Sequence, residues 1–176
     1  FFADDGTGNP LVLESGGLSG FQVKGGAVRN VTDEWSVFGN AGYVSKVPIF
    51  DGVIDDINGI KLDDPQNEKF LSFEAGVSFR SLDRGVSFDA NLYHTTWKDR
   101  ANNMFVRDLL GDNQDGLVRL LGVDARHMGI EMQGAYQPSD LVRFDVAASV
   151  GNWTYLDDVE GTFITDDRQN TITYDF

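Results

Sequence analysis

The sequence is informative first in what it lacks. Its 176 residues include no cysteine, which excludes a disulfide scaffold and any thiolate metal site. Only 14 residues are basic against 28 acidic ones, and this balance argues against nucleic acid as a partner, because phosphate binding needs clustered Lys and Arg. No stretch approaches the length of an apolar transmembrane helix, and helical periodicity is weak throughout.

What the sequence has instead is alternation of apolar and polar side chains. From Leu71 to Phe79, every second residue is apolar and those between are polar or small. Successive side chains of a strand point to opposite faces, so this segment predicts one apolar face and one polar face. The same pattern predicts five further strands, which begin near residues 21, 35, 86, 128 and 142.

The connections between these six strands are short and long in turn. Within three hairpins they are short and carry turn residues, at 30–34, 81–85 and 137–140. Between and after the hairpins they are long, at 48–66, 99–124 and 157–170. Short turns at one end of a sheet and long loops at the other are typical of outer-membrane barrels.

Strand length and charge favour the same interpretation. The predicted strands are longer than the usual 5–6 residues or so of globular proteins, and a tilted membrane-crossing strand needs about 9–11. A soluble antiparallel sheet with one wet face alternates too, and it remains an alternative. Sixteen of the 28 acidic residues lie before residue 20 and in the long connections, not counting Asp99 and Asp124 at the two ends of 99–124, and none lies on the apolar faces. They are Asp4, Asp5, Glu14, Asp51, Asp55, Asp56, Asp63, Asp64, Asp108, Asp112, Asp115, Asp157, Asp158, Glu160, Asp166 and Asp167.

Several short blocks, in order, resemble one known family. They are FGNAGY at 38–43 with Pro48 and Phe50 after it, NEK at 67–69 before a strand ending at Phe79 and Arg80, NLYHTTWKDR at 91–100, GVDARHMGIE at 122–131 and GNWTY at 151–155. Together they span most of residues 20–156, and this pattern is similar to the β-barrel of TonB-dependent outer-membrane receptors.

The resemblance implies a fold, partners and a function. Such receptors are barrels of about 22 strands whose lumen is filled by a plug domain. They take up siderophores, cobalamin or glycans, driven by the TonB complex. We therefore expect an all-β, antiparallel transmembrane barrel segment of about six long strands in three hairpins. Residues 1–176 would be a partial barrel domain without its plug, embedded in the lipid of a Gram-negative outer membrane.

We expect the chain to be a piece of a larger protein. Phe1 is not a methionine, and Thr171 to Phe176 resemble the beginning of another strand. Two other hypotheses stay open: a smaller outer-membrane barrel acting as an enzyme or adhesin, and a soluble β-sandwich binding domain.

The polar faces supply the candidate functional residues. In a barrel these faces would line the lumen, where they would contact the plug or a solute, or form a structural charge ladder. The eight candidates are Glu74, Arg80, Asp89, Asn91, Glu131, Gln133, Arg143 and Asp145. From the expected turns, Arg80 lies diagonal to Asp89, and Arg143 lies opposite Gln133 and beside Glu131.

Aromatic residues near strand ends have two interpretations. Trp35, Trp97, Trp153 and Tyr155 suit the aromatic girdles of a barrel. Trp97 and Trp153 fall on the polar face, which suggests a bulge or a position above the membrane. They are also candidates for stacking against a ligand at the barrel mouth.

Motifs for metal binding and catalysis are missing from the sequence. His94 and His127 are expected on opposite faces, which does not favour a metal site. Residues 51–64 are rich in Asp but lack EF-hand spacing, so solvated loops explain them better than Ca²⁺ does. No G-x-S-x-G, H-E-x-x-H or P-loop occurs. We therefore expect no cofactor, no resident metal and no enzymatic activity.

Overall fold

The computed structural model describes residues 3–4, 10–55, 59–83, 85–111, 114–165 and 169–174. Six long strands form a single-layer sheet: β3 (Phe21–Asn30), β4 (Trp35–Lys46), β7 (Glu68–Arg80), β8 (Val86–Val106), β9 (Gly116–Ser139) and β10 (Val142–Tyr155). The short elements are β1 (Ala3–Asp4), β2 (Pro10–Leu11), η1 (Phe50–Gly52), β5 (Ile54–Asp55), β6 (Ile60–Lys61), β11 (Val159–Ile164) and β12 (Gln169–Tyr174). No helix in the described residues is long and apolar enough to span a membrane.

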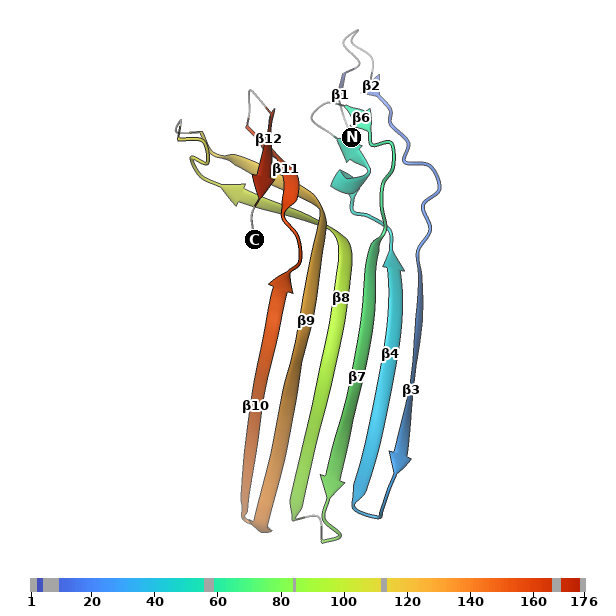
Figure 1. Ribbon diagram of the computed structural model, residues 1–176, viewed down its shortest axis with the longest axis vertical. Coiled ribbons are helices and arrows are strands. Elements are labelled where there is room, and N and C mark those ends of the chain that lie inside the picture. The colour runs from blue at the N-terminus through green and yellow to red at the C-terminus, as the bar shows by residue number, and fades with distance from the viewer. Residues whose placement is uncertain are drawn as a thin grey trace.

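The long strands pair in chain order, and every pairing is antiparallel. The order runs β3, β4, β7, β8, β9 and β10, with β11 and β12 added beside the upper part of β9. Figure 1 shows the short turns together at one end of the sheet and the longer connections at the other. This arrangement confirms the three predicted hairpins.

The short turns are held by local hydrogen bonds. In the 31–34 turn, the backbone N–H groups of Glu34 and Trp35 donate to the Thr32 hydroxyl. In the turn before β8, Asp83 accepts hydrogen bonds from the Ser81 hydroxyl at 2.6 Å and the Gly85 amide at 2.9 Å. These two bonds hold the pKa of the Asp83 carboxyl below its ordinary value, because they stabilise the charged form.

The long connections contain more strand than the sequence predicted. The segment 99–124 was expected to be a loop, but β8 continues to Val106 and β9 begins at Gly116. The segment 157–170 likewise holds β11. The reason is an apolar cluster that alternates along these extensions and is completely or nearly completely buried. Its members are Val118, Leu120, Val123, Val159 and Phe163, with Met104 and Val106 packed against them.

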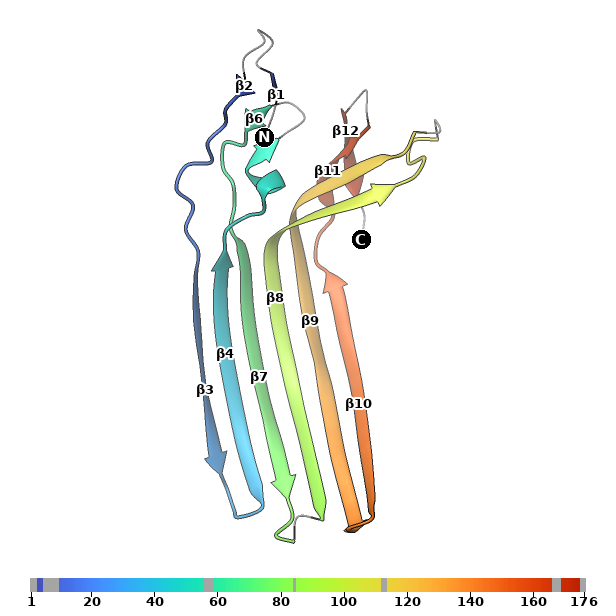
Figure 2. The same cartoon turned by 180° about the vertical axis from the view of Figure 1, so that it is seen from behind.

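Two regions of the molecule can now be defined. The wall comprises β3, β4, β7, residues 86–97 of β8, residues 125–139 of β9, and β10. The cap comprises residues 100–106 of β8, residues 116–123 of β9, β11 and β12. Between them β8 and β9 bend, where the register of this pair shifts and Asp99 and Gly122 have positive φ angles of 57° and 79°. Figure 2 shows from behind how both strands turn away from the wall at this level.

Candidate functional site

One face of the wall is apolar and the other polar, as the alternation predicted. The apolar face exposes a continuous set of large side chains that includes Phe21, Val23, Leu71, Phe73, Leu92, Met128, Ile130, Met132, Phe144, Val146 and Val150. The polar face brings predicted residues side by side: the register pairs Asp89 with Gln133 and Asn91 with Glu131. A face this apolar needs a non-aqueous covering, because soluble monomers rarely expose such a large patch.

A hydrogen-bonded chain crosses the middle of the polar face. The Asn40 amide donates to Glu74 at 3.2 Å, and the Asn91 amide donates to the other oxygen of Glu74 at 3.0 Å. The same Asn91 amide reaches Glu131 at 3.4 Å. Four neighbouring strands, β4, β7, β8 and β9, are therefore linked by side chains as well as by the backbone. Asn40 is a member that the sequence analysis did not single out, although it alternates in phase with its strand.

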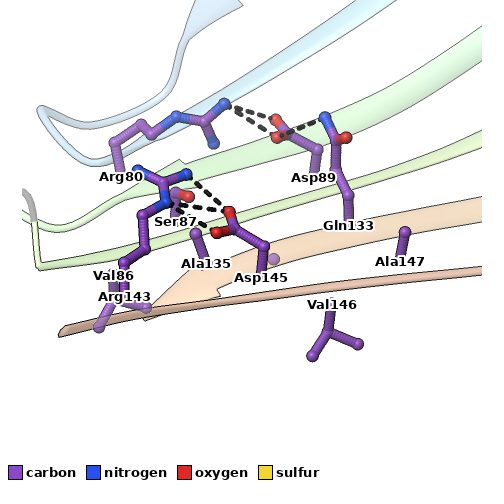
Figure 3. Close-up of a pocket in the computed structure, with 11 residues that line it drawn as sticks. Arg80, Val86, Ser87, Asp89, Gln133, Ala135, Arg143, Asp145, Val146 and Ala147 are labelled. Atoms are coloured by element: carbon purple, nitrogen blue, oxygen red, sulfur yellow. Dashed lines mark hydrogen bonds and ion pairs between the residues drawn. The ribbon is translucent and has the colours of Figure 1, made fainter. Parts of the chain in front are cut away.

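A second cluster lies nearer the short turns and centres on Asp89. The Arg80 guanidinium donates to both Asp89 oxygens at 2.9 and 3.0 Å, which confirms the predicted diagonal contact. Asp89 also accepts hydrogen bonds from the Ser78 hydroxyl at 2.6 Å and the Gln133 amide at 3.2 Å. Figure 3 shows this cluster reaching across from β7 to β9.

The prediction for Arg143 was wrong. It does not lie opposite Gln133 or beside Glu131, because β9 continues to Ser139 and leaves only two residues for the turn. The register places Ala147 opposite Gln133 and Ser149 opposite Glu131. An irregularity between Val142 and Phe144 accommodates Pro138, whose missing N–H is tolerated at such a position.

Arg143 pairs instead with Asp145, two residues along its own strand, at 2.7 Å. This pair and the Arg80–Asp89 pair line a hollow of about 640 Å³, together with Gln133. Figure 3 shows the two pairs lying next to each other over the ribbon. Five of the eight predicted residues thus come together here, while Glu74, Asn91 and Glu131 form the separate chain above.

The two tryptophans face the polar side and are engaged by protein neighbours. Trp97 packs on Phe70, with ring centroids 4.4 Å apart, and the Arg100 guanidinium lies 4.3 Å from the Trp97 ring. The predicted bulge is present directly after Trp97. These contacts describe packing, and a role in ligand stacking stays a prediction.

Trp153 contributes to an aromatic group that the sequence analysis missed. Its indole N–H donates to the Tyr93 hydroxyl at 2.9 Å, and the His127 ring lies 5.9 Å from the Trp153 ring. Tyr93 lies directly over two glycines: a Cβ on Gly129 or Gly151 would come within 2.8 Å of its hydroxyl. The signal in the sequence was a glycine on each of two adjacent strands in phase with a polar-face tyrosine.

The two histidines lie on opposite faces, as expected. His127 pairs in the register with Thr95 and Trp153 on the polar face, whereas His94 lies opposite Phe73 and Met128 on the apolar face. In the described part of the chain, no three His, Asp or Glu side chains are grouped so that they could hold a metal ion. Of the acidic residues named from the sequence, Asp5, Asp56, Asp112, Asp166 and Asp167 lie outside the described residues.

An antiparallel sheet of long strands with one apolar and one hydrogen-bonded polar face defines a segment of a transmembrane barrel. The model of the TonB-dependent receptor-like β-barrel family matches residues 1–175, and the chain belongs to this family. It is a family of outer-membrane receptors and transporters of Gram-negative bacteria. Neither a curated protein nor a solved structure matches the chain.

Proposed function

We propose that this chain is part of the barrel wall of a receptor that takes up a ligand across a Gram-negative outer membrane. The proposal rests above all on the two-faced wall. Its apolar face suits lipid, since an Arg or Lys on a lipid face costs about 2–4 kcal/mol at the midplane. Its polar face suits a lumen, since it carries charged and amide side chains that are bonded to one another.

In this proposal the lumen side is occupied by a plug domain, and the inner-membrane TonB complex drives its rearrangement. The candidates for contact with the plug or a passing solute are Glu74, Arg80, Asp89, Asn91, Glu131, Gln133, Arg143 and Asp145. The cap and the 47–67 connection would lie on the outer side, where a siderophore, cobalamin or glycan-type ligand is captured. Trp97 and Trp153 are then the candidates for stacking against an entering ligand.

The proposal includes no catalytic step. An enzyme of the outer membrane would need a nucleophile, a base and a group that orients the base, and these must lie within hydrogen-bonding reach. The charged residues of the polar face are arranged as ion pairs and amide-to-carboxylate bonds instead. Such groups can bind polar groups of a plug domain or a solute, and this arrangement favours a binding and transport role.

The face assignment can be tested directly because the chain contains no cysteine. In the full-length protein, single cysteines are placed at four successive positions of β10, namely Val146, Ala147, Ala148 and Ser149. A membrane-impermeant charged maleimide should label the cysteines at 147 and 149 in detergent-free outer-membrane vesicles opened to both sides. An apolar maleimide should label those at 146 and 148.

A uniform labelling of all four positions by the charged reagent would contradict the membrane assignment. The transport role is tested separately, by comparing growth on candidate nutrients in cells with and without a functional TonB complex. Growth on one nutrient that depends on both the receptor and TonB supports uptake. Equal growth on every nutrient without the receptor contradicts it.

A further inference from the structure

A small pocket of about 260 Å³ lies at the junction of the wall, the cap and the connection between β4 and β7. Pro48, Leu62 and Leu121 give it apolar lining, and three acidic residues also line it, Asp64, Glu68 and Asp99. No lysine or arginine is part of its lining. By the alternation of β7, Glu68 lies on the same face as Glu74, so the pocket is on the lumen side near the mouth.

Glu68 is the unusual member of this pocket. It is 2% exposed, and one of its carboxylate oxygens accepts a hydrogen bond from the Lys46 ammonium at 3.1 Å. The other oxygen, Oε2, is buried and has no partner among the described residues. A buried charged oxygen without a hydrogen bond is costly, so such an atom on a residue that lines a pocket favours the binding of a hydrogen-bond donor there.

The neighbouring acidic residue at the bend is already satisfied. Asp99 accepts a hydrogen bond from the Lys69 ammonium at 2.7 Å, and its backbone N–H donates to Asp124 at 3.0 Å. The Lys46 ammonium is likewise occupied by Glu68. Both basic groups at the rim are therefore used, and the remaining capacity of the pocket is that of an acceptor for a cation.

The charge distribution of the surrounding connections points in the same direction. The segment before residue 20 and the ranges 48–66, 99–124 and 157–170 contain 18 acidic residues, the 16 counted above with Asp99 and Asp124, and only five basic ones. These five are Lys61, Arg100, Arg107, Arg119 and Arg168. A strongly acidic rim raises the local concentration of cationic solutes and lowers that of anions.

We propose that this pocket binds the positively charged ammonium group of the receptor's ligand, with Glu68 as its main acceptor. The inference rests on the proposed function and narrows its ligand class to molecules that carry a primary ammonium on a short apolar stem. Oε2 of Glu68 accepts a charge-assisted hydrogen bond from the ammonium, and Pro48, Leu62 and Leu121 contact the stem. Such bonds are shorter and stronger than neutral ones.

The test uses n-butylammonium as the probe, with n-butanol and butyrate as the neutral and anionic counterparts. Each is titrated into the purified full-length receptor in detergent and followed by ligand-observed NMR. We expect saturable binding of butylammonium only. Glu68→Gln keeps the side-chain volume and should weaken this binding roughly tenfold, as expected for loss of one bond to a charged acceptor.

Two further variants keep the test decisive if Glu68→Gln folds poorly. Ala101→Leu fills the pocket without removing a charge and should also abolish binding. Lys46→Gln removes the competing cation and should tighten it. Glu34→Gln, in the short turn at the opposite end of the wall, is the matched control and should bind like the wild type.

Three results would overturn the proposal. Butanol binding as tightly as butylammonium would show that the pocket does not select for charge. A wild-type protein without saturable butylammonium binding would show that the pocket takes no ammonium group. Binding of Ca²⁺ from CaCl₂ that is lost in Glu68→Gln, with no binding of butylammonium to the wild type, would identify a metal site. Each of these leaves the labelling pattern of β10 and the TonB-dependent growth unaffected, so failure here is separable from failure of the proposed function.

Discussion

Phe163 in the cap and Phe144 in the wall are both strand phenylalanines in alternating sequence, yet Phe163 is completely buried and Phe144 is 58% exposed. The cap buries its apolar residues against one another, as a soluble protein does. The wall leaves its apolar residues on an open face, which lipid must cover. The same period-two pattern therefore occurs where apolar residues pack inside protein and where they face lipid. The pattern alone does not show which of the two environments a strand faces.

The largest expected effect tests the cap. Replacing Phe163 with Ala removes its largest buried side chain and should cost about 3–5 kcal/mol, as large-to-small core changes do. The cap should unfold locally while the wall persists, since the wall does not depend on this cluster. Limited proteolysis at the cap, read beside heat-dependent gel mobility of the barrel, measures both. Phe105→Ala, at an exposed position of the β8 part of the cap, is the control and should change neither.

A second pair of variants tests the wall. Ala147 and Ala148 are adjacent on β10 but face opposite sides, with Ala147 opposite Gln133 and Ala148 opposite Met132. Ala148→Arg places a charge on the lipid side and should cost about 2–4 kcal/mol, whereas Ala147→Arg enters the polar side and should be tolerated. Urea unfolding in lipid vesicles gives the difference in free energy. Equal costs for the two would mean that the faces are assigned wrongly.

A smaller effect is expected at the glycine beneath Tyr93. A methyl group on Gly129 would meet the Val150 carbonyl oxygen at 2.6 Å and the Tyr93 hydroxyl at 2.7 Å. Gly129→Ala should therefore destabilise the wall by about 1–3 kcal/mol, the usual cost of overpacking. Gly25→Ala is the control, because nothing lies within 4 Å of its added methyl. The two melting curves should separate, and coincident curves would show that Tyr93 moves aside freely.

The wall was largely predictable from the sequence because its strands and their pairing depend on residues that are close together in the chain. A strand's period of two fixes which residues share a face, and a short turn then fixes the register, as for Arg80 and Asp89. Where the turn was misjudged, the register failed with it: Asp140 and Leu141 form a tighter turn than 137–140, so Arg143 moved away from Gln133.

The cap and the pocket were not predictable in the same way. The acidic residues of 99–124 and 157–170 make these segments resemble solvated loops in the sequence. The apolar residues between them, Val118, Leu120 and Phe163, nevertheless alternate as in a strand. The burial of Glu68 depends on the 47–67 connection lying against the bend, which is a contact between segments far apart in sequence. Alternation says nothing about such contacts.

The continuity of β8 and β9 has a mechanical consequence. No loop separates the cap from the wall on these two strands, so a load on the cap passes down two covalent backbones and the hydrogen-bond ladder between them. Such a ladder is loaded in shear and shares the load among many bonds at once. At the bend around Asp99 and Gly122 the register shifts interrupt this ladder, so fewer bonds share the load there, and the Glu68 pocket lies beside it. An occupant of that pocket would contact the wall, the cap and the 47–67 connection at the same time, and so would tie the outer end of the barrel to its wall.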